Sequence, residues 1–243
     1  MGLVLSEQMG QIARAFVTAR REAGRLDDYP GTRPDSLEQA YRIQDAALAI
    51  DGRKVAGWKV GRINPPHDAL LGANRLSGPI FADAVVNAAA GEQPDMPVYA
   101  TGFAAAEAEL LLHVASGWNG QVPTDDRGTK GLIDDVRLGL EIASSPYPGI
   151  NADGPCVTIS DFGNNIGSVI GASLPDWRGL DLCGIVVRTL IDGTVAGEGT
   201  AATMLDGPYG AVRFLLANLA ERGIDVRDGL WVSTGAITGV HPV

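Results

Sequence analysis

The fold depends on how one stretch is interpreted, and that stretch reads Ala104-Ala105-Ala106-Glu107-Ala108-Glu109-Leu110-Leu111-Leu112. Its alanines favour a helix, but on a helix Glu107 and Glu109 would point about 200° apart. On a strand the two residues share one face, and adjacent carboxylates repel each other unless a cation lies between them. Oxygen ligands of this kind suit Mg²⁺, Mn²⁺ or Ca²⁺. The stretch therefore indicates a strand that presents two metal ligands, although the E-x-E pattern is also a common accident.

A third acidic residue stands in a second alternating stretch, Val136-Arg137-Leu138-Gly139-Leu140-Glu141-Ile142. On a strand its apolar side chains share one face, while Glu141 lies on the other face beside Gly139. We interpret the glycine as leaving room for a ligand or a metal ion. The alternative is that Glu107, Glu109 and Glu141 are all solvated strand residues.

A lysine between two glycines marks a possible anion pocket, in the stretch Val55-Ala56-Gly57-Trp58-Lys59-Val60-Gly61. Glycine in a strand often permits close approach by a ligand or by another backbone. Lys59 there could bind a carboxylate or transfer protons, or it could be an edge-strand lysine that discourages aggregation. Asp83 follows soon afterwards. The turn at residues 161–167 is either a simple loop or a loop that closes over polar substrate groups.

The remaining pattern predicts a mixed α/β, β-rich fold. Residues 1–53 form a helical N-terminal segment of two helices, the second with an N-cap at Asp35-Ser36. Residues 54–243 form one β-rich domain with a late helix at about Pro208–Arg222. Its short β-like runs are separated by Gly, Pro, Asn and Asp clusters, and they are Val55–Val60, Glu107–Val114, Val136–Ile142, Pro155–Ile159, Ser168–Ser173 and Leu182–Ile191.

The composition limits the classes of function. The 243 residues carry a formal net charge of −10, which argues against binding to nucleic acid or to an anionic membrane. A small anionic substrate remains compatible, because one lysine and a cation can make a pocket locally positive. Two cysteines outside a CxxC motif and three histidines argue against a zinc site. The cysteine usage fits a reduced, cytoplasmic compartment, and we expect neither a signal peptide nor a transmembrane helix.

Taken together and in order, the motifs resemble the 2-keto-4-pentenoate hydratase and 4-oxalocrotonate decarboxylase branch of the fumarylacetoacetate hydrolase superfamily. They are residues 40–44, 57–61, 81–83, 107–109, 140–142, 161–171 and 234–239. The resemblance implies the mixed β-sheet fold of that superfamily's catalytic domain with a helical N-terminal region, usually in a homo-oligomer. The sequence departs from the pattern at Ala104-Ala105, where relatives have Pro-Arg, at Ile63-Asn64, where they have Thr-Ser, and at His241-Pro242-Val243, where they usually run on.

The resemblance also implies a site. Mg²⁺ or Mn²⁺ would be bound by the three acidic residues, which fall on Glu107, Glu109 and Glu141. Lys59 would be the catalytic lysine with Asp83 as its acidic neighbour. Two polar residues, Asn165 and Thr234, are assigned to substrate binding.

The function that follows is a hydro-lyase, which adds water to a 2-hydroxypenta-2,4-dienoate-type acid to give a 4-hydroxy-2-oxo acid, in a pathway of aromatic hydrocarbon catabolism. One alternative is a decarboxylase of 4-oxalocrotonate-type 2-oxo diacids. Another is a hydrolase that cleaves the C–C bond of acylpyruvates, although the first 50 residues lack the histidine that this reaction uses. A third is a non-catalytic partner subunit.

Overall fold

The computed structural model describes residues 2–243, with side chains described from residue 7 onward. The two predicted N-terminal helices are present as α1 (Gly2–Arg21) and α2 (Leu37–Asp51). Ser36 caps α2, since its side chain accepts the backbone N–H of Gln39 at 3.4 Å. The Gln39 side chain donates in turn to Asp35 at 2.7 Å. Local capping chemistry thus sets where α2 begins.

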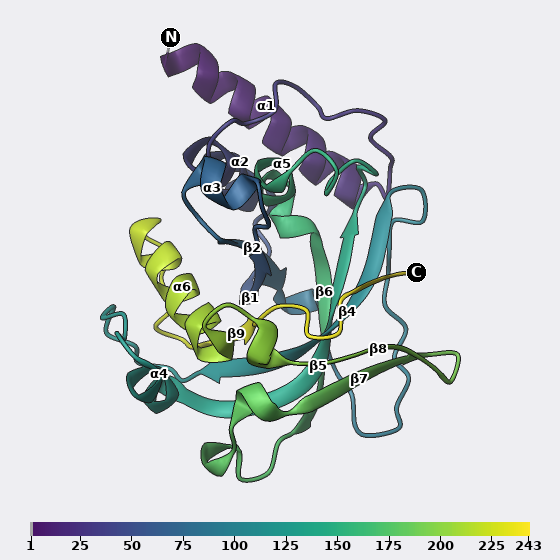
Figure 1. Ribbon diagram of the computed structural model, residues 1–243. Helices are drawn as coiled ribbons and strands as arrows, with labels where there is room; N and C mark the ends of the chain where they lie inside the picture. Colours follow the sequence, from purple (N-terminus) through teal and green to yellow (C-terminus); the bar gives the residue numbers. More distant parts are fainter. Residues whose placement is uncertain (1) are drawn as a thin grey trace.

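The centre of the molecule is one mixed sheet (Figure 1). Eight strands form it within the described residues, in the order β2-β1-β9-β4-β5-β6-β3, with β10 paired to β4. Their bounds are β1 Val55–Arg62, β2 Arg75–Phe81, β3 Val85–Asn87, β4 Phe103–Val114, β5 Ile133–Ser145, β6 Asn165–Ser173, β9 Leu230–Ser233 and β10 Val240–Pro242. The β1–β9 and β3–β6 pairs are parallel and the other pairs antiparallel. This arrangement confirms the predicted β-rich, mixed α/β fold.

Helices and short turns complete the chain. The late helix is α6 (Gly207–Glu221), and β7 (Val186–Ile191) pairs with β8 (Thr194–Thr200) in a separate hairpin. The shorter helical segments are α3 His67–Leu71, α4 Asp126–Leu132, η1 Ala82–Ala84, η2 Phe162–Asn164, η3 Trp177–Gly179, η4 Leu182–Gly184 and η5 Ala201–Thr203. Among the described helices, none is both long enough and apolar enough for a membrane crossing.

Two predicted strands are wrong or too long. Pro155–Ile159 belongs to a helix, α5 (Pro155–Ser160). Proline suits the first helical turn, and the residues after Pro155 in this helix are buried, so the apolar run carries no periodicity that separates helix from strand. The predicted strand Leu182–Ile191 starts as the turn η4 and is extended only from Val186.

Buried side chains connect the helices to the sheet. α6 packs Leu215 and Leu216 onto sheet residues that include Trp58 and Leu110. A second cluster joins α1 and α2, drawn at the top of Figure 1, to the segment around α5, with Phe16 among its buried members. Each fully buried side chain of this size contributes roughly 1.5–3 kcal/mol of hydrophobic stabilisation. The N-terminal helices therefore share a core with residues from much later in the chain.

Candidate active site

The three glutamates meet on neighbouring strands. In the β4–β5 register Glu107 lies opposite Glu141, and Glu109 lies opposite Gly139. Glu109 and Glu141 have no exposed surface, and Glu107 is buried as well. One carboxylate oxygen from each of the three lies within 4.8 Å of the others. The strand interpretation of both stretches therefore brings the three predicted ligands into one cluster.

Gly139 does not leave the space for a ligand that the sequence predicted, but allows neighbouring strands to pack closely. A Cβ atom added there would lie 2.4 Å from the Leu111 side chain and 2.4 Å from the Val169 carbonyl. Leu111 already fills the space beside this glycine, and the backbone of β6 approaches closely. Gly139 thus permits close strand packing and does not leave room for a metal ion.

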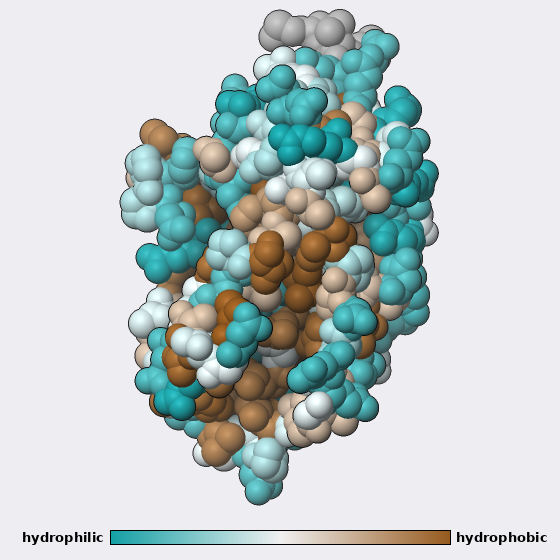
Figure 2. Space-filling view, turned by 90° about the vertical axis from the view of Figure 1, so that its right-hand side faces the viewer, coloured by the Kyte–Doolittle hydropathy of each residue, from teal (hydrophilic) through white to brown (hydrophobic). Residues whose placement is uncertain are grey.

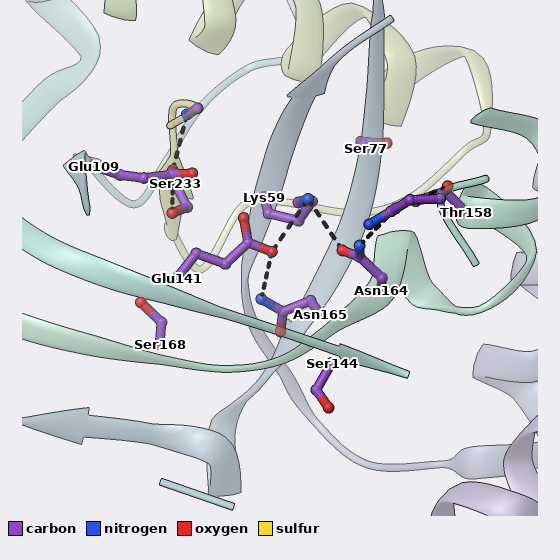
Figure 3. A network of polar contacts seen from close by, with 12 residues as sticks. Lys59, Ser77, Glu109, Glu141, Ser144, Thr158, Asn164, Asn165, Ser168 and Ser233 are labelled. Carbon is purple, nitrogen blue, oxygen red and sulfur yellow. Dashed lines mark hydrogen bonds and ion pairs between the residues drawn. The ribbon is translucent and has the colours of Figure 1, made fainter. Parts of the chain in front are cut away.

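Lys59 reaches the cluster from β1. Its Nζ lies 3.2 Å from Glu141 Oε1 and 3.5 Å from Asn164 Oδ1, between the two side chains (Figure 3). Two strands, β9 and β4, separate β1 from β5 in the sheet order, so the contact requires a strongly curled sheet. β1 is an interior strand and Lys59 is buried, which excludes the edge-strand interpretation. The glycine at position 57 permits close approach of β9, since a Cβ there would lie 2.5 Å from the Trp231 carbonyl.

In Glu109 and Glu141, only one of the two carboxylate oxygens accepts hydrogen bonds. Glu109 Oε2 accepts hydrogen bonds from Ser233 Oγ at 2.5 Å and from the Gly235 N–H at 2.8 Å. Glu141 Oε1 accepts one from Asn165 Nδ2 at 3.1 Å. The second oxygens, Glu109 Oε1 and Glu141 Oε2, are buried and have no partner among the described residues. A buried acceptor without a partner costs about 1–3 kcal/mol, and more when charged.

A hard divalent cation fits this donor set. All the candidate ligand atoms are carboxylate oxygens, which Mg²⁺, Mn²⁺ and Ca²⁺ prefer. The two buried oxygens without a partner would gain one from the cation. Partners that orient the candidate ligands are also present, because Ser233, Gly235 and Asn165 hold the opposite oxygens of Glu109 and Glu141.

The titration of the cluster reflects its burial. Burial and the charge of Glu141 raise the pKa of Glu107 to about 7. Burial and both neighbouring carboxylates raise the pKa of Glu109 well above its usual value. Burial alone would lower the pKa of Lys59, but the charges of Glu141, Glu107 and Glu109 outweigh it and raise that pKa. The cluster thus favours a proton or another positive charge between its carboxylates.

A cavity of about 710 Å³ opens beside the cluster, lined by Lys59 and Glu107. The predicted substrate residue Thr234 lines it and donates its hydroxyl to the Leu110 carbonyl at 2.8 Å. Asn165 lies at the cluster as the partner of Glu141 and is absent from the cavity lining. Its neighbour Asn164 does line the cavity. The segment 161–165 is buried throughout, so it belongs to the interior and is not a loop that closes over the site.

Asp83 does not join Lys59. It lies in η1, its side chain is 61% exposed, and its carboxylate is 3.5 Å from Arg53. It lines a separate cavity of about 500 Å³. The register explains the separation, because the β2 residue opposite Lys59 is Gly78 and the turn that carries Asp83 follows the end of β2. The predicted pairing of Asp83 with Lys59 is therefore wrong.

Three polar residues of the site were not predicted individually from the sequence. Asn164 contacts Lys59, Asn151 accepts a hydrogen bond from Asn164 Nδ2 at 3.0 Å, and Ser233 holds Glu109. A weak signal existed for two of them. Asn164 stands beside Asn165 in a glycine-rich turn, and Ser233 comes directly before Thr234 and Gly235 at the end of a strand.

Comparison with solved structures supports the fold. No family model matches the chain. The structure resembles 4-oxalocrotonate decarboxylase from Pseudomonas putida G7 in complex with magnesium and adipate, with a TM-score of 0.75 and 23% identity over 98% of this chain and 90% of that one. The same enzyme with calcium and acetate gives a TM-score of 0.73 and 22% identity, with the same coverage.

A second neighbour is fumarylpyruvate hydrolase from Pseudomonas aeruginosa in complex with Mn²⁺ and pyruvate, with a TM-score of 0.55 and 19% identity over 78% of this chain and 81% of that one. Both neighbours lie in the superfamily that the sequence motifs indicate. The chain therefore has the fold of the fumarylacetoacetate hydrolase superfamily, which confirms the predicted resemblance at the level of the fold.

Proposed function

We propose that this chain is a divalent-metal-dependent lyase that acts on small 2-oxo or 2-hydroxydienoate acids. The observation that carries the proposal is the pair of buried carboxylate oxygens without partners, Glu109 Oε1 and Glu141 Oε2, beside a buried lysine. The complexes of the structural neighbours with magnesium and adipate and with Mn²⁺ and pyruvate support it.

The proposed metal ligands are Glu107, Glu109 and Glu141. Mg²⁺ or Mn²⁺ bound there would supply Lewis-acid chemistry, which would stabilise the negative charge that develops at C2–C3 of the substrate. Ser233 and Asn165 hold the ligands Glu109 and Glu141 in place. Partners of this second layer typically change metal affinity or activity about 10- to 100-fold when they are removed.

Lys59 is the proposed proton-transfer group. Its ammonium lines the cavity, and Glu141 and Asn164 fix its direction. In the metal-free protein the neighbouring carboxylates raise the pKa of Lys59. As a cation Lys59 would attract the anionic substrate and could donate a proton to the carbon that carries the developing charge. Thr234 lines the same cavity and is the proposed contact of the substrate's polar groups.

Hydration of a 2-hydroxydienoate is the reaction that the sequence predicts. Decarboxylation of a 2-oxo diacid is the second candidate, and two observations favour it. The similarity to 4-oxalocrotonate decarboxylase extends over 98% of the chain. The cavity lining also includes the cationic or basic side chains Arg62 and His67, which suit a second carboxylate on a substrate. Both reactions pass through the same C2–C3 enolate.

A single assay separates the candidates. Purified protein is incubated with 2-hydroxypenta-2,4-dienoate or with 4-oxalocrotonate, in Mn²⁺ or in chelator, and the dienol absorbance and CO₂ release are followed. A 4-hydroxy-2-oxo product identifies a hydratase, and CO₂ from the diacid identifies a decarboxylase. An acylpyruvate serves as third substrate, since its cleavage would identify a C–C hydrolase. Bound Mn²⁺ without turnover of any of these acids would indicate the partner subunit and contradict the proposed lyase.

We also propose that the chain forms the homo-oligomer that the resemblance implies. Several large apolar side chains of the β7–β8 hairpin are exposed, among them Val186, Leu190 and Val195. The face drawn on the right in Figure 1 gathers apolar side chains in its hollowed centre, with polar ones at its borders (Figure 2). Light scattering on the eluting protein measures the subunit number, and a strictly monomeric species at high concentration would contradict this proposal.

A further inference from the structure

An arginine of the first helix is buried at the back of the site. Only 3% of the Arg20 side chain is exposed, although it lies at the end of α1. It forms an ion pair with Asp161, whose side chain has no exposed surface, and one of the two contacts measures 2.9 Å from Nη2 to Oδ2. Arg20 also donates to three carbonyl groups, those of Asn165 at 2.8 Å, Asp161 at 3.1 Å and Ser144 at 3.2 Å.

The segment that Arg20 holds has an unusual backbone. Phe162, Gly163 and Asn164 have consecutive positive φ angles of 53°, 64° and 58°. Left-handed conformations are uncommon for residues other than glycine, and persist only where surrounding contacts enforce them. Arg20 supplies such contacts on both sides of the three residues, through Asp161 before them and Asn165 after them. The close approach of Gly78, whose added Cβ would lie 2.2 Å from the Phe162 carbonyl, fixes the turn from the other side.

The same turn carries the two amides that touch the site. Asn164 Oδ1 lies 3.5 Å from Lys59 Nζ, and Asn165 Nδ2 donates to Glu141 Oε1 at 3.1 Å. Figure 3 shows both amides beside the Lys59–Glu141 pair. A change in the turn would therefore move the lysine and one proposed metal ligand together. Arg20 itself lines only the second, separate cavity, so it acts on the site through the turn.

We propose that Arg20 is a positioning residue, which holds the turn 161–165 in its left-handed conformation and thereby sets the directions of Lys59 and Glu141. Only the planar guanidinium, with five donors, can serve the Asp161 carboxylate and the three carbonyls at once. Lysine at this position keeps the charge but has a single nitrogen. The role of Arg20 in metal binding rests on the proposed function, whereas its effect on Lys59 is independent of it.

The decisive experiment observes Lys59 directly in the metal-free protein. The sequence has only three lysines, Lys54, Lys59 and Lys130, and a substitution of arginine by lysine adds one more, so a lysine-labelled sample gives few side-chain NMR signals. In each background Lys59 is identified by the signal that disappears in Lys59→Met. We expect Arg20→Lys to shift the Lys59 signal and leave those of Lys54 and Lys130 in place.

The matched control is Arg222→Lys. The Arg222 side chain is 7% exposed and paired with Asp45, and it contacts no residue of the turn. A milder second variant is Ser145→Ala, which removes the hydroxyl that donates to Asp161 at 2.6 Å but leaves the ion pair. We expect a smaller shift of the Lys59 signal in Ser145→Ala and none in Arg222→Lys. The comparison is made between variants that lose comparable thermal stability.

Calorimetric titration with Mn²⁺ provides the second readout. We expect Arg20→Lys to weaken Mn²⁺ binding by about tenfold or more, as for other residues that position a metal ligand, and Arg222→Lys to leave it unchanged. If the Lys59 signal stays in place in a folded Arg20→Lys or Ser145→Ala protein, or moves equally in the control, the positioning role is wrong. If the wild type binds no Mn²⁺, the proposed function fails, and the NMR comparison still decides the role of Arg20.

Discussion

Removing a carboxylate from the cluster should stabilise the metal-free protein. The perturbation is Glu107→Gln, which keeps the size of the side chain. The folded structure raises the pKa of Glu107 from 4.5 to about 7. At about 1.4 kcal/mol per pH unit, this rise corresponds to a cost of about 3 kcal/mol for the ionised Glu107 in the folded state. The Glu107 charge also raises the pKa of Glu109, so removing that charge lowers the cost of ionising Glu109 and stabilises the folded variant further.

The pH dependence has a definite sign. A group whose pKa is raised on folding contributes stability that is present below its unfolded pKa and is lost as the pH rises through its folded pKa. In chelator the two proteins should therefore be equally stable near pH 4.5. The wild type should lose the stability contributed by protonated Glu107 as the pH rises through about 7. Above pH 7 the variant should be more stable by about 3 kcal/mol, or roughly 6–12 °C in Tm for a chain of this size.

Thermal or urea unfolding in chelator between pH 4.5 and 8 measures the difference. Saturating Mn²⁺ should reverse the order, because only the wild type keeps all three proposed ligands. At about 1,000 times its Kd a ligand stabilises by about 4.1 kcal/mol, which exceeds the variant's advantage of about 3 kcal/mol. A variant that is less stable than the wild type in chelator at every pH would refute the reasoning. So would a stability difference that does not change with pH.

Three further variants test the site. Glu109→Gln should abolish Mn²⁺ binding and turnover while its circular dichroism stays native, and full activity in a chelated sample would contradict the metal mechanism. Lys59→Met should still bind Mn²⁺ in calorimetry but turn over substrate about 10²-fold more slowly or worse, whereas normal turnover would make Lys59 merely structural. Asp83→Asn should leave kcat unchanged because Asp83 lies on a separate cavity, and a loss like that of Lys59→Met would show that it reaches the site.

Much of the secondary structure was predictable because its causes are local. The spacing of Glu107 and Glu109 identified β4, alternation within 136–142 identified β5, and the cap at Ser36 marked the start of α2. The site was partly predictable for the same reason, since the spacing of Glu107 and Glu109 places both on one face of a strand. The strand prediction for 155–159 failed because a short, wholly buried run has no periodicity to interpret.

The sequence by itself determined which residues could serve as ligands and on which faces of their strands they stand, since these depend on spacing alone. The tertiary structure decided which of them meet. The curl of the sheet brings Lys59 of β1 to Glu141 of β5, while the register of β1 and β2 leaves Asp83 outside. It also placed Arg20 behind the site, 141 residues from Asp161 in sequence. Sheet curvature and packing arise from contacts between distant segments, so no local pattern encodes them.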